Sequence, residues 1–114
     1  MPPQRGDTSD LLSPLIRSQL IEGRVLVFYF SAPWCGACKI MEHTIIKNPP
    51  IATKLSDAGF LKIDIEAEPS TAAALGVSAV PTLIIVSDSG AELYRRVGLI
   101  ESKALALVLD ELIE

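Results

Sequence analysis

The stretch that decides the fold is residues 25–39, which reads VLVFYFSAPWCGACK. Its first part, Val25–Phe30, is continuously β-branched, aliphatic or aromatic, which is typical of a strand that is buried on both faces of a sheet. Ser31–Trp34 then predicts a turn, and Cys35 opens a new pattern in which apolar residues recur at helical spacing. The stretch therefore predicts a central strand that leads directly into a helix beginning at Cys35.

Helices and strands are predicted to alternate along the rest of the chain. Asn48-Pro49-Pro50 must interrupt the helix that begins at Cys35, because proline lacks a backbone N–H and restricts the residue before it. A helical segment between the first two strands favours a right-handed parallel crossover, and Ser87–Gly90 predicts a hairpin between the last two. The further helices are expected over Ser9–Ile21, about Ile51–Asp57, Pro69–Leu75 and Glu101–Ile113, and the further strands over Phe60–Ile65, Thr82–Val86 and Glu92–Val97. This order indicates an α/β fold.

The length and charge of the chain limit what it can be. Its 114 residues fit one domain, and 49% hydrophobic with 21% charged residues is ordinary for a globular protein. We expect a flexible N-terminal tail over residues 1–8 and a single domain over residues 9–114. Fourteen acidic and ten basic residues give a net charge of -4, which provides no electrostatic footprint for nucleic acid or for an anionic membrane surface. Nucleic acid is therefore not an expected partner.

The distribution of apolar residues predicts no membrane insertion. The longest apolar stretch, Val25–Phe30, is far shorter than the roughly 18–20 residues that span a bilayer. The first residues, Met1–Asp7, are polar where a secretory signal would carry an apolar region of about 7–15 residues. We expect a cytoplasmic location by default, with a periplasmic or other extracytoplasmic location as the alternative if a leader has been removed.

Two cysteines, Cys35 and Cys38, are the only ones in the chain, and two residues separate them. A disulfide between them closes too small a loop to stabilise a fold much. A structural zinc site takes four ligands, and the chain offers only these two thiols and one histidine, His43. The spacing suits a redox pair. Two alternatives stay open, namely a metal or iron-sulfur module that two chains share through paired thiolates, and a binding module whose cysteines no longer turn over.

The predicted position of the cysteines on the helix gives them different chemistry. At the start of a helix, free N–H groups and the helix dipole favour a thiolate, and this is expected to lower the pKa of Cys35 from about 8.5 into a range of about 3.5–7.5. Cys38, one turn further on and facing the core, is expected to be less exposed and to have the higher pKa. The pattern favours Cys35 as the attacking thiol and Cys38 as the thiol that resolves a mixed disulfide.

The segment FYFSAPWCGACK, residues 28–39, resembles the active-site strand and helix start of the thioredoxin family. Further along, Val80-Pro81-Thr82 is similar to the cis-proline loop of that family. Asp88-Ser89-Gly90 with Val97-Gly98 is similar to its closing hairpin and the glycine that follows. The resemblance extends from about Leu11 to the C-terminus. It implies a thioredoxin fold, with a central mixed four-stranded sheet, a fifth short strand as an option, and helices on both faces.

The resemblance also implies a function and a set of roles. The activity would be reduction of protein disulfides through the Cys35–Cys38 dithiol, with Cys35 as nucleophile, Cys38 as resolving thiol and no bound cofactor. Disulfide-containing proteins would be the substrates, and an upstream thiol reductase or a membrane thiol donor would supply electrons to a monomer. The substrate would contact an apolar platform around Cys35, made of Trp34, Gly36, Val80, the cis-proline Pro81 and Gly98.

Within the family, one segment points to a subgroup. The run Cys38–Glu42, followed by the Pro49-Pro50 break, looks more like the DsbD-type C-terminal domains of bacterial thiol reductases than like housekeeping thioredoxin.

The chain departs from the family pattern at two positions. Ala37 replaces the usual proline between the cysteines, from which we expect a reducing to intermediate potential. Tyr29 stands where many relatives have a buried aspartate that moves the proton of the resolving thiol, and it could instead contribute a hydroxyl to proton transfer or tuning, or simply pack. Lys62 matches a lysine that normally partners that aspartate, and Lys39 matches a helix lysine with a modest electrostatic effect. We therefore hypothesise that Glu42, one turn after Cys38, or water accepts this proton.

Several other residues have a structural rather than a functional interpretation. A lone helical histidine such as His43 is more often a surface residue than a ligand. Tyr29, Met41 and Phe60 lie in core-like patterns. The acidic run Asp64, Glu66 and Glu68 lacks the pattern of a metal-binding loop and is expected to be a solvated edge. No metal ligand is assigned.

Overall fold

The computed structural model describes residue 20 and residues 23–113. The tail predicted over residues 1–8 and the helix predicted over Ser9–Ile21, apart from Leu20, lie outside these residues. In chain order the elements are β1 (Leu26–Ser31), α2 (Gly36–Ile46), α3 (Pro49–Leu55), β2 (Gly59–Asp64), α4 (Pro69–Ala74), β3 (Thr82–Val86), β4 (Glu92–Val97) and α5 (Ser102–Leu112). None of the helices in this part of the chain is long and apolar enough to cross a membrane.

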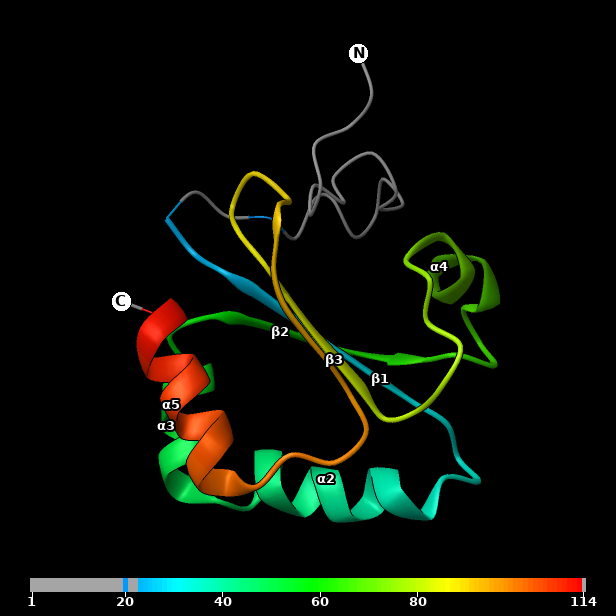
Figure 1. The fold of residues 1–114 in the computed structure, drawn as a ribbon, viewed down its shortest axis with the longest axis horizontal. Coiled ribbons are helices and arrows are strands. Elements are labelled where there is room, and N and C mark those ends of the chain that lie inside the picture. The colour runs from blue at the N-terminus through cyan, green and yellow to red at the C-terminus, as the bar shows by residue number, and fades with distance from the viewer. Residues whose placement is uncertain (1–19, 21–22, 114) are drawn as a thin grey trace.

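The four strands form one mixed sheet in the order β2-β1-β3-β4 (Figure 1). β1 pairs parallel with β2 and antiparallel with β3, and β3 pairs antiparallel with β4. The parallel pair is joined through α2 and α3, as the crossover rule predicts. Helices cover both faces of the sheet, so the predicted α/β class and the mixed four-stranded sheet are confirmed. The optional fifth strand is not among the strands of residues 23–113.

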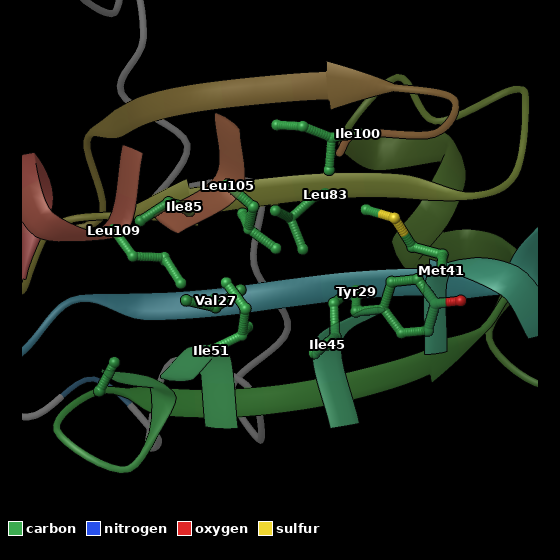
Figure 2. Packing of buried hydrophobic residues seen from close by; sticks show 11 residues of the cluster. Val27, Tyr29, Met41, Ile45, Ile51, Leu83, Ile85, Ile100, Leu105 and Leu109 are labelled. Atoms are coloured by element: carbon green, nitrogen blue, oxygen red, sulfur yellow. The ribbon is translucent and has the colours of Figure 1, made fainter. Parts of the chain in front are cut away.

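β1 is buried along its whole length, because it lies between two strands and under helices on both faces. Its side chains alternate between the faces and so contribute to two separate cores. On one face, Phe28 and Phe30 pack with residues of β3, with Ala72 of α4 and with Leu75, the C-cap of that helix. The face opposite holds Val27 and Tyr29 together with Met41, Ile45, Ile51, Leu83, Ile85, Ile100, Leu105 and Leu109 (Figure 2).

The core that contains Tyr29 is closed by three helices. α2 contributes Met41 and Ile45, α3 contributes Ile51, and α5 contributes Leu105 and Leu109. A short turn after β1 leads into α2 (Figure 1), and Cys35 and Cys38 lie at the N-cap and in the first turn of this helix. The core fixes the position of the helix that carries both thiols.

Several predicted boundaries differ from the structure by one or two residues, and three of the differences have a local reason. β1 continues through Ser31, predicted as turn, because Ser31 still pairs with Asp64 of β2. α3 begins at Pro49 rather than near Ile51, since proline in the first helical turn loses no hydrogen bond. α2 begins at Gly36, and Cys35 is its N-cap rather than its first residue.

Replacing Leu105 of α5 by alanine tests the importance of this core. Leu105 is 1% exposed, so Leu105→Ala should lower the free energy of unfolding by about 2–5 kcal/mol through lost apolar burial and a residual cavity. Leu107→Ala is the matched control on the same helix, because Leu107 is 70% exposed and its replacement should change stability by about 0.5 kcal/mol or less. Denaturant unfolding measures both. Equal losses in the two variants would contradict the packing of α5 described here.

Candidate active site

Cys35 and Cys38 form a disulfide at the start of α2, with their Cα atoms 5.2 Å apart. Cys35 is the N-cap residue, with an extended backbone at φ -87° and ψ 104°. Its Sγ accepts a hydrogen bond from the backbone N–H of Cys38 at 3.0 Å. The free N–H groups and the positive end of the helix dipole are therefore directed at the sulfur of Cys35, where they stabilise negative charge.

The two sulfurs differ in their access to solvent. Cys35 is 5% exposed and Cys38 is 1% exposed, so Cys38 is the less exposed cysteine, as predicted. Both pack with Ala32 in a small apolar cluster, against which Ala37, Ile65 and Val80 also lie. An attacking reagent reaches Cys35 more readily than Cys38.

The loop before β3 lies against the disulfide. Val80 packs on the cysteine cluster, and the Val80–Pro81 peptide bond is cis. The carbonyl of Pro81 accepts a hydrogen bond from the N–H of Gly98 at 2.8 Å. Gly98 has φ +93°, a region that favours glycine. The fold thus brings together Cys35, the 80–81 loop and Gly98, which are far apart in the sequence.

Trp34 is 66% exposed beside Cys35 and is held by an acidic residue. Its indole N–H donates to Oε1 of Glu66 at 2.7 Å, and the N–H of Glu66 donates to Oδ1 of Asp64 at 2.8 Å. The acidic run was expected to be only a solvated edge. That expectation was incomplete, because Glu66 is exposed but also positions the tryptophan. The predicted parallel pairing of β1 with β2 could have indicated this contact, because Trp34 and Glu66 follow the carboxyl ends of these strands, which meet at one edge of the sheet.

Tyr29 is completely buried and contacts the turn of α2 that carries Cys38. Its hydroxyl donates to the carbonyl oxygen of Cys38 at 2.9 Å, and its ring stacks on Phe60 at a centroid distance of 6.4 Å. Burial, with a further contribution from the charge of Glu42, raises the pKa of Tyr29 well above its usual range. Tyr29 is therefore a neutral hydrogen-bond donor as well as a core residue. Phe60, expected in the core, is partly exposed because β2 is an edge strand.

Glu42 of α2 forms an ion pair with Lys62 of β2. Lys62 is directly opposite Tyr29 in the parallel register of β1 and β2. The ion pair therefore lies on the same face of the sheet as the Tyr29 side chain. A pocket of about 370 Å³ adjoins the Glu42–Lys62 ion pair and extends to the turn after β1. Its lining consists of Ser31, Ala32, Pro33, Lys39, Glu42, Lys62 and Asp64.

The remaining predicted residues take simple places. Gly36 is exposed as the first residue of α2, with open space where a Cβ would lie. Lys39 is exposed in the next turn of the helix. His43 is also exposed on α2. Within residues 23–113 no three side chains of the metal-ligating types gather into a group that could hold an ion.

Removing the Tyr29 hydroxyl tests its bond to Cys38. Tyr29→Phe keeps the packing but leaves the buried carbonyl of Cys38 without this donor, so the free energy of unfolding should fall by about 1–3 kcal/mol in denaturant titrations. Tyr94→Phe is the control, because Tyr94 packs on the same core and its hydroxyl has no hydrogen-bond partner among the described residues. Its replacement should change stability by about 0.5 kcal/mol or less.

The stability difference between wild type and Tyr29→Phe should also depend on pH. Because the folded state raises the pKa of Tyr29, the unfolded chain loses that proton first as the pH rises above about 10. Wild type therefore loses stability in this range relative to Tyr29→Phe, and the difference between their free energies of unfolding should become smaller. A gap that widens with pH would contradict a neutral, buried hydroxyl.

Comparison with known proteins places these features in context. The family model described as Thioredoxin matches residues 16–111. The chain is 38% identical over 92 residues to a thioredoxin of Chlamydia muridarum, covering 81% of this chain and 85% of that one. It is 36% identical over 91 residues to a thioredoxin of Staphylococcus aureus, with 80% and 85% covered.

Solved structures give the same result. A mutant thioredoxin from Halobacterium salinarum aligns with a TM-score of 0.76 at 28% identity, covering 90% of this chain and 87% of that one. The thioredoxin of Fasciola hepatica aligns with a TM-score of 0.70 at 28% identity, covering 96% and 99%. The similarity thus extends over most of the chain and includes the segment that carries both cysteines.

Proposed function

Because the chain belongs to the thioredoxin family and is a thiol-disulfide oxidoreductase, we propose that Cys35 attacks the substrate disulfide and that Cys38 resolves the mixed disulfide. The observation that carries this assignment is the position of Cys35 at the N-cap of α2. Its Sγ accepts a hydrogen bond from the Cys38 N–H, and Cys35 is the more exposed of the two cysteines. Such a sulfur is both a stabilised thiolate and an accessible nucleophile.

The reaction balances within this pair of thiols. The Cys35 thiolate attacks one sulfur of the substrate disulfide, and the other substrate sulfur leaves with the electron pair. Cys38, as thiolate, then attacks the Cys35 sulfur and releases the second substrate thiol. The substrate gains two electrons, and the protein is left with the Cys35–Cys38 disulfide that the structure contains.

The surface around Cys35 suits an extended polypeptide. The backbone of Val80 makes no hydrogen bond within the described part of the chain, so it is free to pair with a substrate strand. Trp34 offers a large exposed apolar face on one side of Cys35. Pro81, Gly98 and Gly36 complete a platform of small or apolar residues that leaves the substrate backbone room to approach. The platform supports binding of disulfide-containing proteins with broad sequence preference.

The electron donor and the setting of the protein are finer proposals. Reduction of the Cys35–Cys38 disulfide requires two electrons from another dithiol, which we assign to an upstream thiol reductase or a membrane thiol donor. The monomeric state, the cytoplasmic location and the likeness to DsbD-type domains stay predictions.

The two alternatives left open by the sequence are not favoured. A metal or iron-sulfur module and an inactive binding module share the C-x-x-C spacing. The matches to thioredoxins over four fifths of the chain, together with a disulfide between the two cysteines, support disulfide exchange instead.

Single replacements of the cysteines test the assigned roles. Cys38→Ser should lose disulfide reductase turnover and accumulate a stable mixed disulfide between Cys35 and a disulfide-bonded peptide, because no resolving thiol remains. Mass spectrometry under non-reducing conditions detects the added peptide half. Cys35→Ser should lose turnover without accumulating a mixed disulfide with the peptide.

The wild-type protein is the control, since it should release both peptide thiols and retain no adduct. An adduct on Cys38 in Cys35→Ser, formed as fast as the one on Cys35, would contradict the assignment. Equal activity of all three proteins would contradict disulfide exchange altogether.

A further inference from the structure

The resolving step raises a question that the disulfide chemistry alone leaves open, namely where the proton of Cys38 goes. The thiolate is the attacking form, and burial in apolar surroundings disfavours it. Cys38 is nearly inaccessible and packs with Ala32 and Val80. Fast resolution therefore needs a base near this sulfur.

Tyr29 does not serve as that base. Its side chain is completely buried, and its hydroxyl already donates to the carbonyl of Cys38. A donor in this bond holds the turn of α2 against β1 and accepts no proton. The buried tyrosine is a positioning residue, and it keeps formal charge out of the core at this point.

Glu42 is the carboxylate best placed for the task. It lies four residues after Cys38 on α2, and residues at this spacing share one face of a helix. The next residue, His43, lies about a quarter of a helical turn further around α2 from Glu42, away from the face that carries Cys38, and it is exposed. The charge of Glu42 also acts on the Tyr29 hydroxyl, which contacts the Cys38 carbonyl. The carboxylate is thus close to the turn that contains the resolving cysteine.

Glu42 is paired with a cation at the margin of the core. Its side chain is 22% exposed and forms the ion pair with Lys62 of β2. Lys39 and Asp64 line the same pocket, and Lys39, His43 and Lys47 line a second pocket with Glu42. The groups facing Glu42 are therefore three lysines, one histidine, one carboxylate and the Tyr29 hydroxyl. The ion pair holds the carboxylate of Glu42 at the edge of this pocket.

The pocket beside Glu42 also reaches a neighbour of Cys38. It has a volume of about 370 Å³, and its lining includes Glu42, Lys62 and Ala32, which packs with both cysteines. A space of this size with charged side chains in its lining accommodates several water molecules. Water in it can carry a proton over the gap that a direct hydrogen bond does not bridge.

We propose that Glu42 is the base of the resolving step: it takes the Cys38 proton through water in this pocket, while Lys62 pairs with Glu42 and Tyr29 positions Cys38. The proposal rests on the roles assigned to Cys35 and Cys38 above. The Cys38 S–H bond breaks and its proton passes to the carboxylate of Glu42. The Cys38 sulfur then bonds to Cys35, the bond from Cys35 to the substrate sulfur breaks, and that sulfur leaves with the electron pair. Protonated Glu42 afterwards returns the proton to solvent or to the leaving thiolate.

A two-phase reaction with dithiobis(nitrobenzoate) separates this step from the first attack. The reduced protein releases one coloured thiolate when Cys35 attacks and a second when Cys38 resolves the mixed disulfide. In Glu42→Gln the second phase should slow at least about tenfold near pH 7, the lower range of what a general base contributes. The rate of the first phase should stay within about threefold of the wild-type rate, and each protein molecule should still release two coloured thiolates in total.

The pH profile of the second phase gives a readout that a structural role would not change. In wild type the rate should depend only weakly on pH while Glu42 is ionised. In Glu42→Gln the rate should rise about tenfold per pH unit, because the thiolate then forms only by loss of its proton to solvent. Identical profiles in the two proteins would overturn the proposal.

Two further variants serve as matched controls. Lys62→Met breaks the same ion pair but keeps the carboxylate, so its second phase should slow less than that of Glu42→Gln and should keep the weak pH dependence of wild type. Asp64→Asn removes an equal charge from the same pocket and should leave the second phase within about threefold of wild type. If Asp64→Asn slows the second phase as much as Glu42→Gln, or if Lys62→Met shows the steep pH profile expected of Glu42→Gln, the effect comes from the local field or from the ion pair, and the assignment of Glu42 as base fails. Loss of the first phase or of the second thiolate in wild type would instead refute the proposed roles of the cysteines.

Discussion

The structure depends on the way β1 is held between β2 and β3. β1 is buried along its length and hydrogen-bonded on both sides, so its carboxyl end at Ser31 has a fixed place. The parallel register brings Asp64 of β2 to that end, and the antiparallel register brings Thr82 of β3 close to it through Phe30. The active-site turn, the loop that carries Glu66 and the Val80–Pro81 loop all adjoin these ends. The reactive sulfurs therefore occupy a position set by backbone pairing.

Tyr29 connects this framework to the chemistry. Its ring belongs to the core shared by α2, α3 and α5, while its hydroxyl reaches the carbonyl of Cys38. A buried carboxylate at this position would require a compensating partner, because a charge in an apolar core is costly. The neutral hydroxyl meets no such penalty and leaves the charged groups, Glu42 and Lys62, at the margin of the protein. In the proposal made above, positioning of the resolving thiol and acceptance of its proton are separate functions of separate residues.

Much of the fold could be predicted from local patterns. The apolar run Val25–Phe30 identified the central strand, and the predicted bounds of β3 and β4 agree with the structure. These elements are set by nearby residues, as turns and β-branched runs usually are. The start of α3 at Pro49 was missed because a proline pair marks both the end of one helix and the beginning of the next.

The candidate site could be predicted only in part. The cysteines follow from their spacing, but the pairs Trp34 with Glu66 and Glu42 with Lys62 join residues of β2 or its following loop to the β1–α2 segment. Such pairs depend on which residues of β1 and β2 face each other, and a shift of the register would separate them. Tyr29 could be predicted as buried, whereas its bond to the Cys38 carbonyl depends on how closely α2 packs against β1.

The most direct test of this account is the redox equilibrium of the Cys35–Cys38 pair in graded dithiothreitol buffers, followed by the fluorescence of Trp34, the only tryptophan. We predict one reversible two-electron transition that does not change with protein concentration and that is absent in Cys38→Ala, because both thiols belong to one chain. No reversible transition, or a midpoint that moves with protein concentration as an intermolecular disulfide would require, would contradict the account.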